Sequence, residues 1–253
     1  MDSTEKQRFL KSLIYPGLLL LIIWVIWLVE FWGKFDLSGF GLLPQHISGL
    51  KGIIFSPLLH GSFSHIAANS VPLFVLAGGL FYFYEKTALR ILALLWVTTG
   101  IWVWVFAKDT GIHVGASGVV YALAAFHFTG GVIRREAKMM AFSLLVVFLY
   151  GGLIWGIIPD FLPEKNISWE SHLLGLLAGV LIALFYRKTG PQRKEYHWED
   201  EEDEPDQEPP ALDEMNAYPE TEKHQDPQSN PTTEIIYHYK QNESTPDEKS
   251  QNS

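Results

Sequence analysis

The residues of this chain that could carry out chemistry lie within its apolar segments, where polar groups are costly. Ser117 stands in the run GIHVGASGVVYAL, between Gly115 and Gly118, at the start of one such segment. His172 stands in SHLLGLLAG, near the start of a later one. A serine hydroxyl becomes a nucleophile at neutral pH when an adjacent base takes its proton, and histidine is the usual base. The pair therefore indicates nucleophilic chemistry if folding brings the two side chains together.

A third segment contributes hydrogen-bond donors. His65 and Asn69 are four residues apart, so a helix presents both on one face. Both side chains can donate hydrogen bonds, and acyl transfer needs such donors where the oxyanion forms. The backbone N–H of Ser117, at a helix N-terminus, would be a further donor. His60 lies just outside this helix and could join the network or line the water entry.

Small residues favour close packing between the segments that carry Ser117 and His172. Gly118 begins a row of small residues that continues at i+4 and i+7, and Gly175 and Gly179 follow His172 at i+3 and i+7. Such faces let two membrane helices approach closely. The contact would bring the imidazole toward the hydroxyl. Taken alone, the same small residues are also an ordinary packing face with no catalytic role.

Six apolar segments must position these residues, each close to the ~20 residues that a membrane-spanning helix needs. They cover residues 13–32, 66–84, 88–107, 115–132, 139–158 and 169–186. Charged residues are concentrated between the segments, as the cost of a charge at the centre of a bilayer demands. We therefore expect an all-α membrane protein with six transmembrane helices, which excludes a soluble globular domain for this part of the chain.

Basic residues predict the orientation of this bundle. Twelve Lys and Arg residues near the segment ends fall on one side and four on the other, and the richer side is expected to be cytoplasmic. Both termini are then cytoplasmic in a multi-pass protein of the cell membrane. The segments that begin near 66, 115 and 169 all start at the external face, so their polar residues share one layer there. A transport path would more naturally place polar groups near the midplane.

Composition divides the chain into three parts. Residues 1–12 are a short cytoplasmic N-terminus, 13–187 the membrane domain, and 188–253 an acidic cytoplasmic tail. The tail carries 18 of the 28 acidic residues but only 6 of the 19 Lys and Arg, and it is expected to be disordered. The external loop 33–65 contains an interrupted apolar stretch that is expected to lie at the membrane interface. The absence of cysteine excludes thiol chemistry, and the absence of a basic stripe argues against nucleic-acid binding.

These residues together resemble the rhomboid family of intramembrane serine proteases. The resemblance covers roughly residues 10–187, and it is specific because order, spacing and helix number agree across three motifs. They are His60, His65 and Asn69 on the second segment, Gly115-Ala116-Ser117-Gly118 opening the fourth, and His172, Gly175 and Gly179 on the sixth. It implies a six-helix bundle around a water-filled cavity open to the outside, with no metal or organic cofactor.

The resemblance also implies roles. Ser117 would be the nucleophile and His172 the general base and acid, in a dyad without an acidic third member. His65, Asn69 and the Ser117 backbone would form the oxyanion hole, while Tyr121 would pack beside His172. The expected substrates are single-pass membrane proteins, cleaved within or near their spanning helix. They would enter between the second and fifth spans, with the loop 159–168 as a cap.

Two other classes of protein stay open at this point. One is a rhomboid-like protein without activity that binds membrane helices. The other is a haem or metal protein ligated by histidines, although the chain has no HExxH motif or facing histidine pairs. Among the histidines, His113 competes with His172 as the base, whereas His127 lies ~15 Å along the helix from Ser117. The oligomeric state and the natural substrate are not predicted.

Overall fold

The apolar segments fold as helices in the computed structural model, which describes residues 3–108, 111–149 and 169–190. The longer helices are α1 (Ser3–Ser12), α2 (Ile14–Gly33), α4 (Phe63–Phe83), α5 (Ala88–Phe106), α6 (Ser117–Arg134), α7 (Ala137–Leu149) and α9 (Trp169–Phe185). Short helical turns between α2 and α4 are η1 (Ser38–Phe40), η2 (Ile47–Gly49), α3 (Gly52–Phe55) and η3 (Ser56–Leu58). The second half of the predicted fifth span, the 159–168 loop and the tail from residue 191 lie outside the described residues.

The N-terminal segment, expected only as a short cytoplasmic N-terminus, is helical. Residues 5–8 are good helix formers, and α1 leads almost directly into α2. Arg8 donates to the carbonyl of Tyr82 at 2.7 Å, and its guanidinium lies 4.9 Å from the centroid of the Tyr82 ring. These contacts hold α1 against the last turn of α4.

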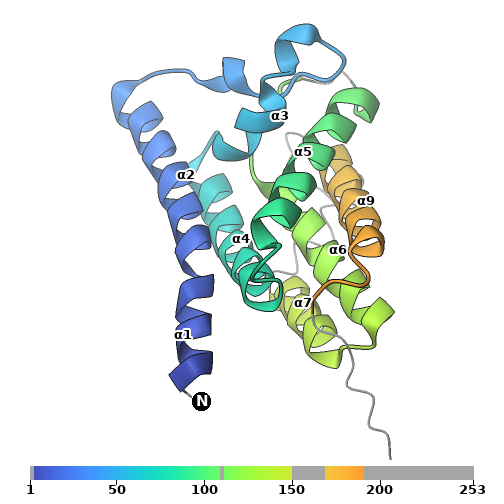
Figure 1. Cartoon of the computed structure of the whole chain (residues 1–253). Helices are drawn as coiled ribbons and strands as arrows, with labels where there is room; N and C mark the ends of the chain where they lie inside the picture. The colour runs from blue at the N-terminus through green and yellow to red at the C-terminus, as the bar shows by residue number, and fades with distance from the viewer. Residues whose placement is uncertain (1–2, 109–110, 150–168, 191–253) are drawn as a thin grey trace, which may run out of the picture. The chain divides into compact units, whose positions relative to one another are not determined.

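Three helices are long and apolar enough to cross a membrane: α1 and α2 taken together, α4 and α5. Among the described residues, α6, α7 and α9 do not meet that criterion, so the predicted count of six spans is not confirmed. Of these three helices, α6 is the least apolar, and most of its residues are buried by neighbouring helices. It packs most extensively against α9, and also against α4, α5 and α7 (Figure 1).

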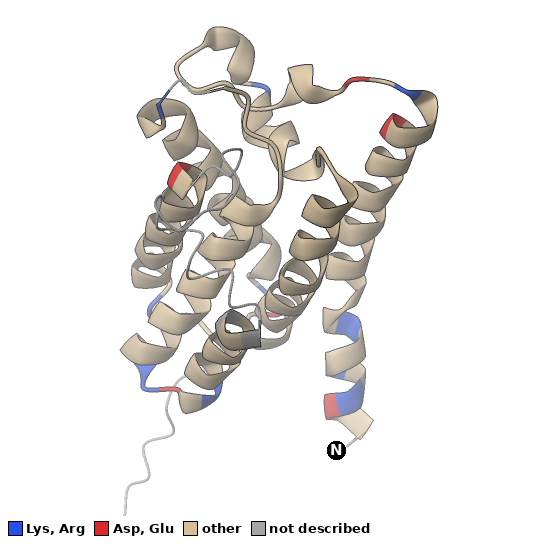
Figure 2. Cartoon of the chain, turned by 180° about the vertical axis from the view of Figure 1, so that it is seen from behind, with Lys and Arg blue, Asp and Glu red and all other residues tan. Residues whose placement is uncertain are grey.

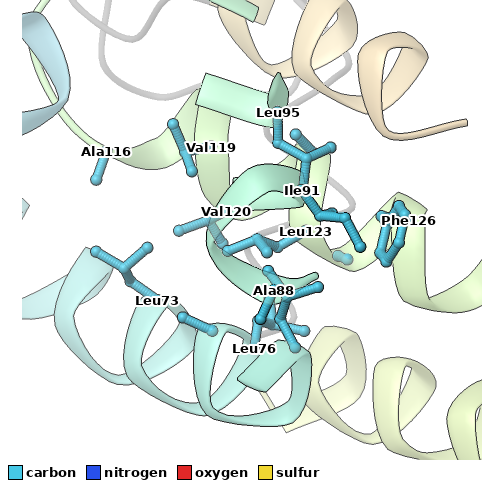
Figure 3. Packing of buried hydrophobic residues seen from close by; sticks show 14 of the residues in the cluster. Leu73, Leu76, Ala88, Ile91, Leu95, Ala116, Val119, Val120, Leu123 and Phe126 are labelled. Carbon is cyan, nitrogen blue, oxygen red and sulfur yellow. The ribbon is translucent and has the colours of Figure 1, made fainter. Parts of the chain in front are cut away.

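The hydrophobic core lies where α4, α5 and α6 meet. Leu73 and Leu76 of α4, Ile91 and Leu95 of α5, and Leu123 of α6 are almost fully buried there. Figure 3 shows these side chains directed into one shared layer between the three helices. The core therefore fixes α6 against α4, and this places the first residue of α6 beside the start of α4.

The helices α4, α6 and α9 all begin at the end of the bundle that carries α3, which we call the upper end (Figure 1). The N-terminus and the turn between α6 and α7 lie at the opposite end. Lys and Arg residues lie on α1 and at the α6–α7 turn, and the long stretches between the two ends are largely uncharged (Figure 2). The arrangement agrees with the expectation that the three polar helix starts share one layer.

Short helical turns between α2 and α4 lie at the upper end of the bundle. The indole N–H of Trp104 donates to the carbonyl of His46 at 2.8 Å, and that of Trp96 donates to the carbonyl of Ile54 at 3.2 Å. These bonds hold the segment against α5 at the upper end.

The helix α4 begins three residues earlier than the apolar pattern predicted. Ser62 has extended backbone, and its hydroxyl accepts the N–H of His65 at 3.2 Å, which is an N-cap. A serine shortly before an apolar run is the signal that could have identified this start. The earlier start makes His65 part of the first turn and fixes the direction of its side chain.

Candidate active site

Ser117 and His172 are in hydrogen-bond contact. Ser117 is the first residue of α6, and its Oγ lies 2.9 Å from Nε2 of His172, in the first turn of α9. The imidazole is buried, while the serine is half-buried. A proton on the hydroxyl can therefore pass directly to the ring nitrogen.

Small residues allow this contact, as predicted. A Cβ at Gly175 would overlap the carbonyl oxygen of Gly118, and one at Gly179 would overlap that of Ala122. The backbones of α6 and α9 consequently touch where the small faces meet. Gly118 itself has the carbonyl of Ser171 3.2 Å from its own Cβ position.

Tyr121 fixes the plane of the histidine ring. It lies one turn after Ser117 on α6, and its ring stacks on the imidazole with centroids 4.3 Å apart and an interplanar angle of 18°. Tyr121 is also buried, so the stack is shielded from solvent. The ring of His172 is therefore held between a stacking partner and a hydrogen-bond partner, both from α6.

The turn before Ser117 requires a glycine. Gly115 has a φ of +111°, a region that favours glycine, and a Cβ there would lie 2.5 Å from the ring of His65. Its N–H donates to the carbonyl of Ser56 at 2.8 Å. The next N–H, of Ala116, points to Nε2 of His60 at 3.4 Å. The chain entering α6 is thus anchored to the segment before α4.

His65 and Asn69 lie against this same turn. The Asn69 amide nitrogen would be 3.7 Å from a Cβ at Gly115, and it donates one hydrogen bond to the carbonyl of His65 at 3.2 Å. An amide nitrogen carries two N–H groups, so one donor is left for a ligand. The N–H of Ser117, at the start of α6, has no partner within its own helix. The side chains of His65 and Asn69 from α4 therefore lie at the turn that leads into Ser117.

His60 borders a cavity of about 510 Å³ between α2 and the start of α4. The cavity is lined by Trp27, Glu30, Phe31, His60, Gly61, Ser62 and Phe63. Since the His60 ring also contacts the turn before Ser117, its position fits the predicted role at a water entry.

Burial of His60 predicts acid sensitivity. Burial, with a smaller contribution from His65, lowers the pKa of His60 from 6.5 to about 3, and the carbonyl of Leu58 offsets this only in part. As the pH falls, His60 gains a proton in the unfolded chain near its ordinary pKa of 6.5, whereas in the folded chain it stays neutral until about 3. The free energy of unfolding therefore falls as the pH drops from about 6.5 toward 3. We expect a loss of about 2 kcal/mol at pH 5 from this group.

Thermal unfolding of the wild type and His60→Gln in detergent, measured at pH 7.5 and pH 5, tests the expectation. The variant should lose less stability on acidification, whatever its stability at pH 7.5. Equal losses in the two proteins would contradict the assignment to His60.

The two other candidate histidines do not reach Ser117. Nδ1 of His113 lies 3.0 Å from the hydroxyl of Ser171, and Nε2 of the fully buried His127 lies 3.0 Å from the carbonyl of Leu76. Burial lowers the pKa of His113, and the Glu170 carboxylate raises it to a lesser extent. Of the histidines considered as the base, His172 is the one that contacts the serine. Within residues 3–108, 111–149 and 169–190, no three acidic or histidine side chains cluster as a metal site would require.

A family model and the name of one relative indicate the same family. The family model described as the Rhomboid domain matches residues 47–189. "Uncharacterized protein Rv1337" of Mycobacterium tuberculosis is 34% identical over 164 residues, which are 61% of this chain and 65% of that protein, less than two thirds of its length. "Uncharacterized protein ML1171" of Mycobacterium leprae is 28% identical over 201 residues, 76% of this chain and 78% of that protein. "Putative rhomboid protease YdcA" of Bacillus subtilis is 28% identical over 127 residues, 50% of this chain and 62% of that protein.

Proposed function

Because the chain belongs to the rhomboid family, we propose that it is an intramembrane serine endopeptidase that cleaves single-pass membrane proteins within or near their spanning helix. Family membership confirms the resemblance drawn from the motifs. The single observation that supports the proposal most strongly is the 2.9 Å contact between the Ser117 hydroxyl and the His172 ring.

The proposed reaction uses Ser117 and His172 as a dyad. The Ser117 oxygen attacks the carbonyl carbon of the scissile bond while Nε2 of His172 takes its proton. The tetrahedral intermediate then collapses, the C–N bond breaks, and His172 returns the proton to the leaving amine. A water molecule, deprotonated by the same ring, hydrolyses the acyl-enzyme and regenerates the serine.

Donors beside the dyad fit an oxyanion hole. The side chains of His65 and Asn69 lie at the turn at Gly115, and Ser117 follows two residues later at the start of α6. Preorganised donors of this kind stabilise the negative charge that develops on the carbonyl oxygen. We assign them that role because they come from two helices that the core already fixes against each other.

The membrane setting follows from the same proposal. The upper end would face the outside of the cell, with both termini in the cytoplasm, so that water reaches Ser117 from the external side. Substrate helices would enter laterally from the bilayer between α4 and α7. Apolar side chains exposed on the long helices, such as Leu21, Val71 and Leu145, fit contact with lipid.

A fluorophosphonate probe tests the function in the wild-type protein. The probe should react covalently with the Ser117 oxygen, and the labelled protein should no longer cleave single-pass substrates reconstituted with it in liposomes. Mass spectrometry locates the adduct and the substrate cleavage sites. A protein that folds but shows neither labelling nor cleavage would instead be the silent, helix-binding relative considered above, which the Ser117–His172 contact does not favour.

Loss of one oxyanion donor should lower activity without removing it. Asn69→Ala is expected to reduce kcat ~10²-fold, about 3 kcal/mol of transition-state stabilisation, with KM little changed. The reason is that the donors from His65 and Ser117 remain. Steady-state kinetics in detergent measure kcat and KM separately. An unchanged kcat would contradict the assignment of Asn69 to the oxyanion hole.

A further inference from the structure

A second serine–histidine pair lies beside the first. Ser171 directly precedes His172 on α9, and its Oγ is 3.0 Å from Nδ1 of His113. His113 stands in the turn that leads into α6, four residues before Ser117. The mechanism proposed above makes no use of this pair, although it joins the same two parts of the chain as the dyad.

Contacts from three consecutive residues of α9 form a ladder along this turn. The backbone N–H of Lys108 donates to both carboxylate oxygens of Glu170, at 3.2 and 3.3 Å. These three residues of α9 contact successive positions of the segment from the end of α5 to the start of α6: Glu170 contacts Lys108, Ser171 contacts His113, and His172 contacts Ser117. The distance between His172 and Ser117 therefore depends on the two contacts made by Glu170 and Ser171.

His113 is itself held by its main chain. Its N–H donates to the carbonyl of Leu42 at 2.7 Å, and its carbonyl accepts the N–H of Leu42 at 2.9 Å. Leu42 is almost fully buried against Val103 and Ala107, and Leu174 of α9 packs on the same cluster. The His113 ring is thus a fixed point to which the first turn of α9 is attached.

We propose that His113 and Ser171 are positioning residues that hold the His172 ring at bonding distance from the Ser117 hydroxyl, an inference that rests on the proposed function. The first turn of a helix lacks N-terminal backbone partners, so side-chain contacts set its position. A displacement of 1 Å in a catalytic group costs ~10²-fold in rate. The pair acts through the dyad and does not touch substrate.

The test compares Ser171→Ala and His113→Phe with the double variant. Each single variant should lower kcat and the rate of fluorophosphonate labelling about tenfold, with KM unchanged, because the dyad loosens while binding is retained. The double variant should be no slower than either single one, since both remove the same contact. Ser171→Thr and His113→Asn, which keep a hydroxyl or a hydrogen-bonding group near Nδ1, should restore most of the rate.

Ser70→Ala provides the matched control. Ser70 also pairs with a ring nitrogen of another helix, since the Trp24 indole N–H donates to its hydroxyl at 3.0 Å. The control should leave kcat unchanged. In Ser171→Ala, amide hydrogen exchange of residues 111–117 should become faster, and in Ser70→Ala it should not.

The outcomes separate the two proposals. A wild-type protein that the probe never labels overturns the proposed function and the positioning role with it. Labelling at the wild-type rate in Ser171→Ala and His113→Phe, even with lowered thermal stability, overturns the positioning role alone. Multiplied losses in the double variant would also overturn it, because two independent effects would then be at work.

Discussion

Replacing Ser117 with alanine is expected to abolish cleavage while leaving the fold intact. The loss should be at least ~10³-fold, the scale seen when a catalytic serine is removed, because the acyl-enzyme forms on its oxygen. His172→Ala should cause a loss of similar size, because the hydroxyl then has no base at 2.9 Å to take its proton. Combining the two should add little, since both residues act in one step.

Matched measurements distinguish loss of chemistry from loss of folding. Ser117→Ala removes one hydrogen bond, worth about 1 kcal/mol, so thermal unfolding in detergent should change little. Substrate binding should also persist, which a pull-down of an uncleaved single-pass protein can show. Cleavage by Ser117→Ala at the wild-type rate would exclude Ser117 as the nucleophile and, with it, the proposed function.

The contact between Ser117 and His172 could be predicted from the sequence because it follows from the helical spacing of the small residues beside them. His172, Gly175 and Gly179 share one face of α9, and Gly118 starts the matching face of α6. Close packing of these small faces favours a register in which the serine and the histidine meet. The polar layer at the upper end is predictable for a similar reason, since each group stands near the start of its helix.

Other features depend on contacts between distant parts of the chain, which no local pattern encodes. The pairing of Leu42 with His113 joins a turn after α2 to the turn before α6. Only the folded chain shows that His113 is thereby turned toward Ser171 and away from Ser117. Apolar periodicity does not predict the helix over residues 3–12 for a different reason, because this segment is polar.

The helix α6 shows a limit of hydropathy as a criterion for membrane spans, whereas the described parts of α7 and α9 are apolar but shorter than that criterion requires. The helix α6 carries Ser117 and His127 and is buried by its neighbours, so it does not need the apolar surface that lipid demands of α2 or α5. A hydropathy criterion detects contact with lipid, whereas α6 is largely surrounded by protein. The helix that carries Ser117 is therefore the one for which that criterion is weakest.

Enlarging Gly175 is expected to have the second largest effect. A Cβ at this position would overlap the carbonyl oxygen of Gly118, which is backbone and cannot rotate away, so Gly175→Ala must push α9 from α6. Overpacking of this kind costs about 1–3 kcal/mol of stability. A shift of 1 Å would lower cleavage and fluorophosphonate labelling by ~10²-fold. Thermal unfolding and labelling rates, measured on the same samples, provide both quantities.

Gly17→Ala provides the control for this prediction, because Gly17 also lies in a long apolar helix but has no atom within 4 Å of its Cβ position. It should keep both its stability and its labelling rate. A Gly175→Ala protein that is less stable but is labelled at the wild-type rate would show that the helix contact supports the fold alone. A slow labelling rate at a temperature where the variant is still folded would instead tie the rate to the separation of α6 and α9, because the Ser117–His172 bond spans that same interface.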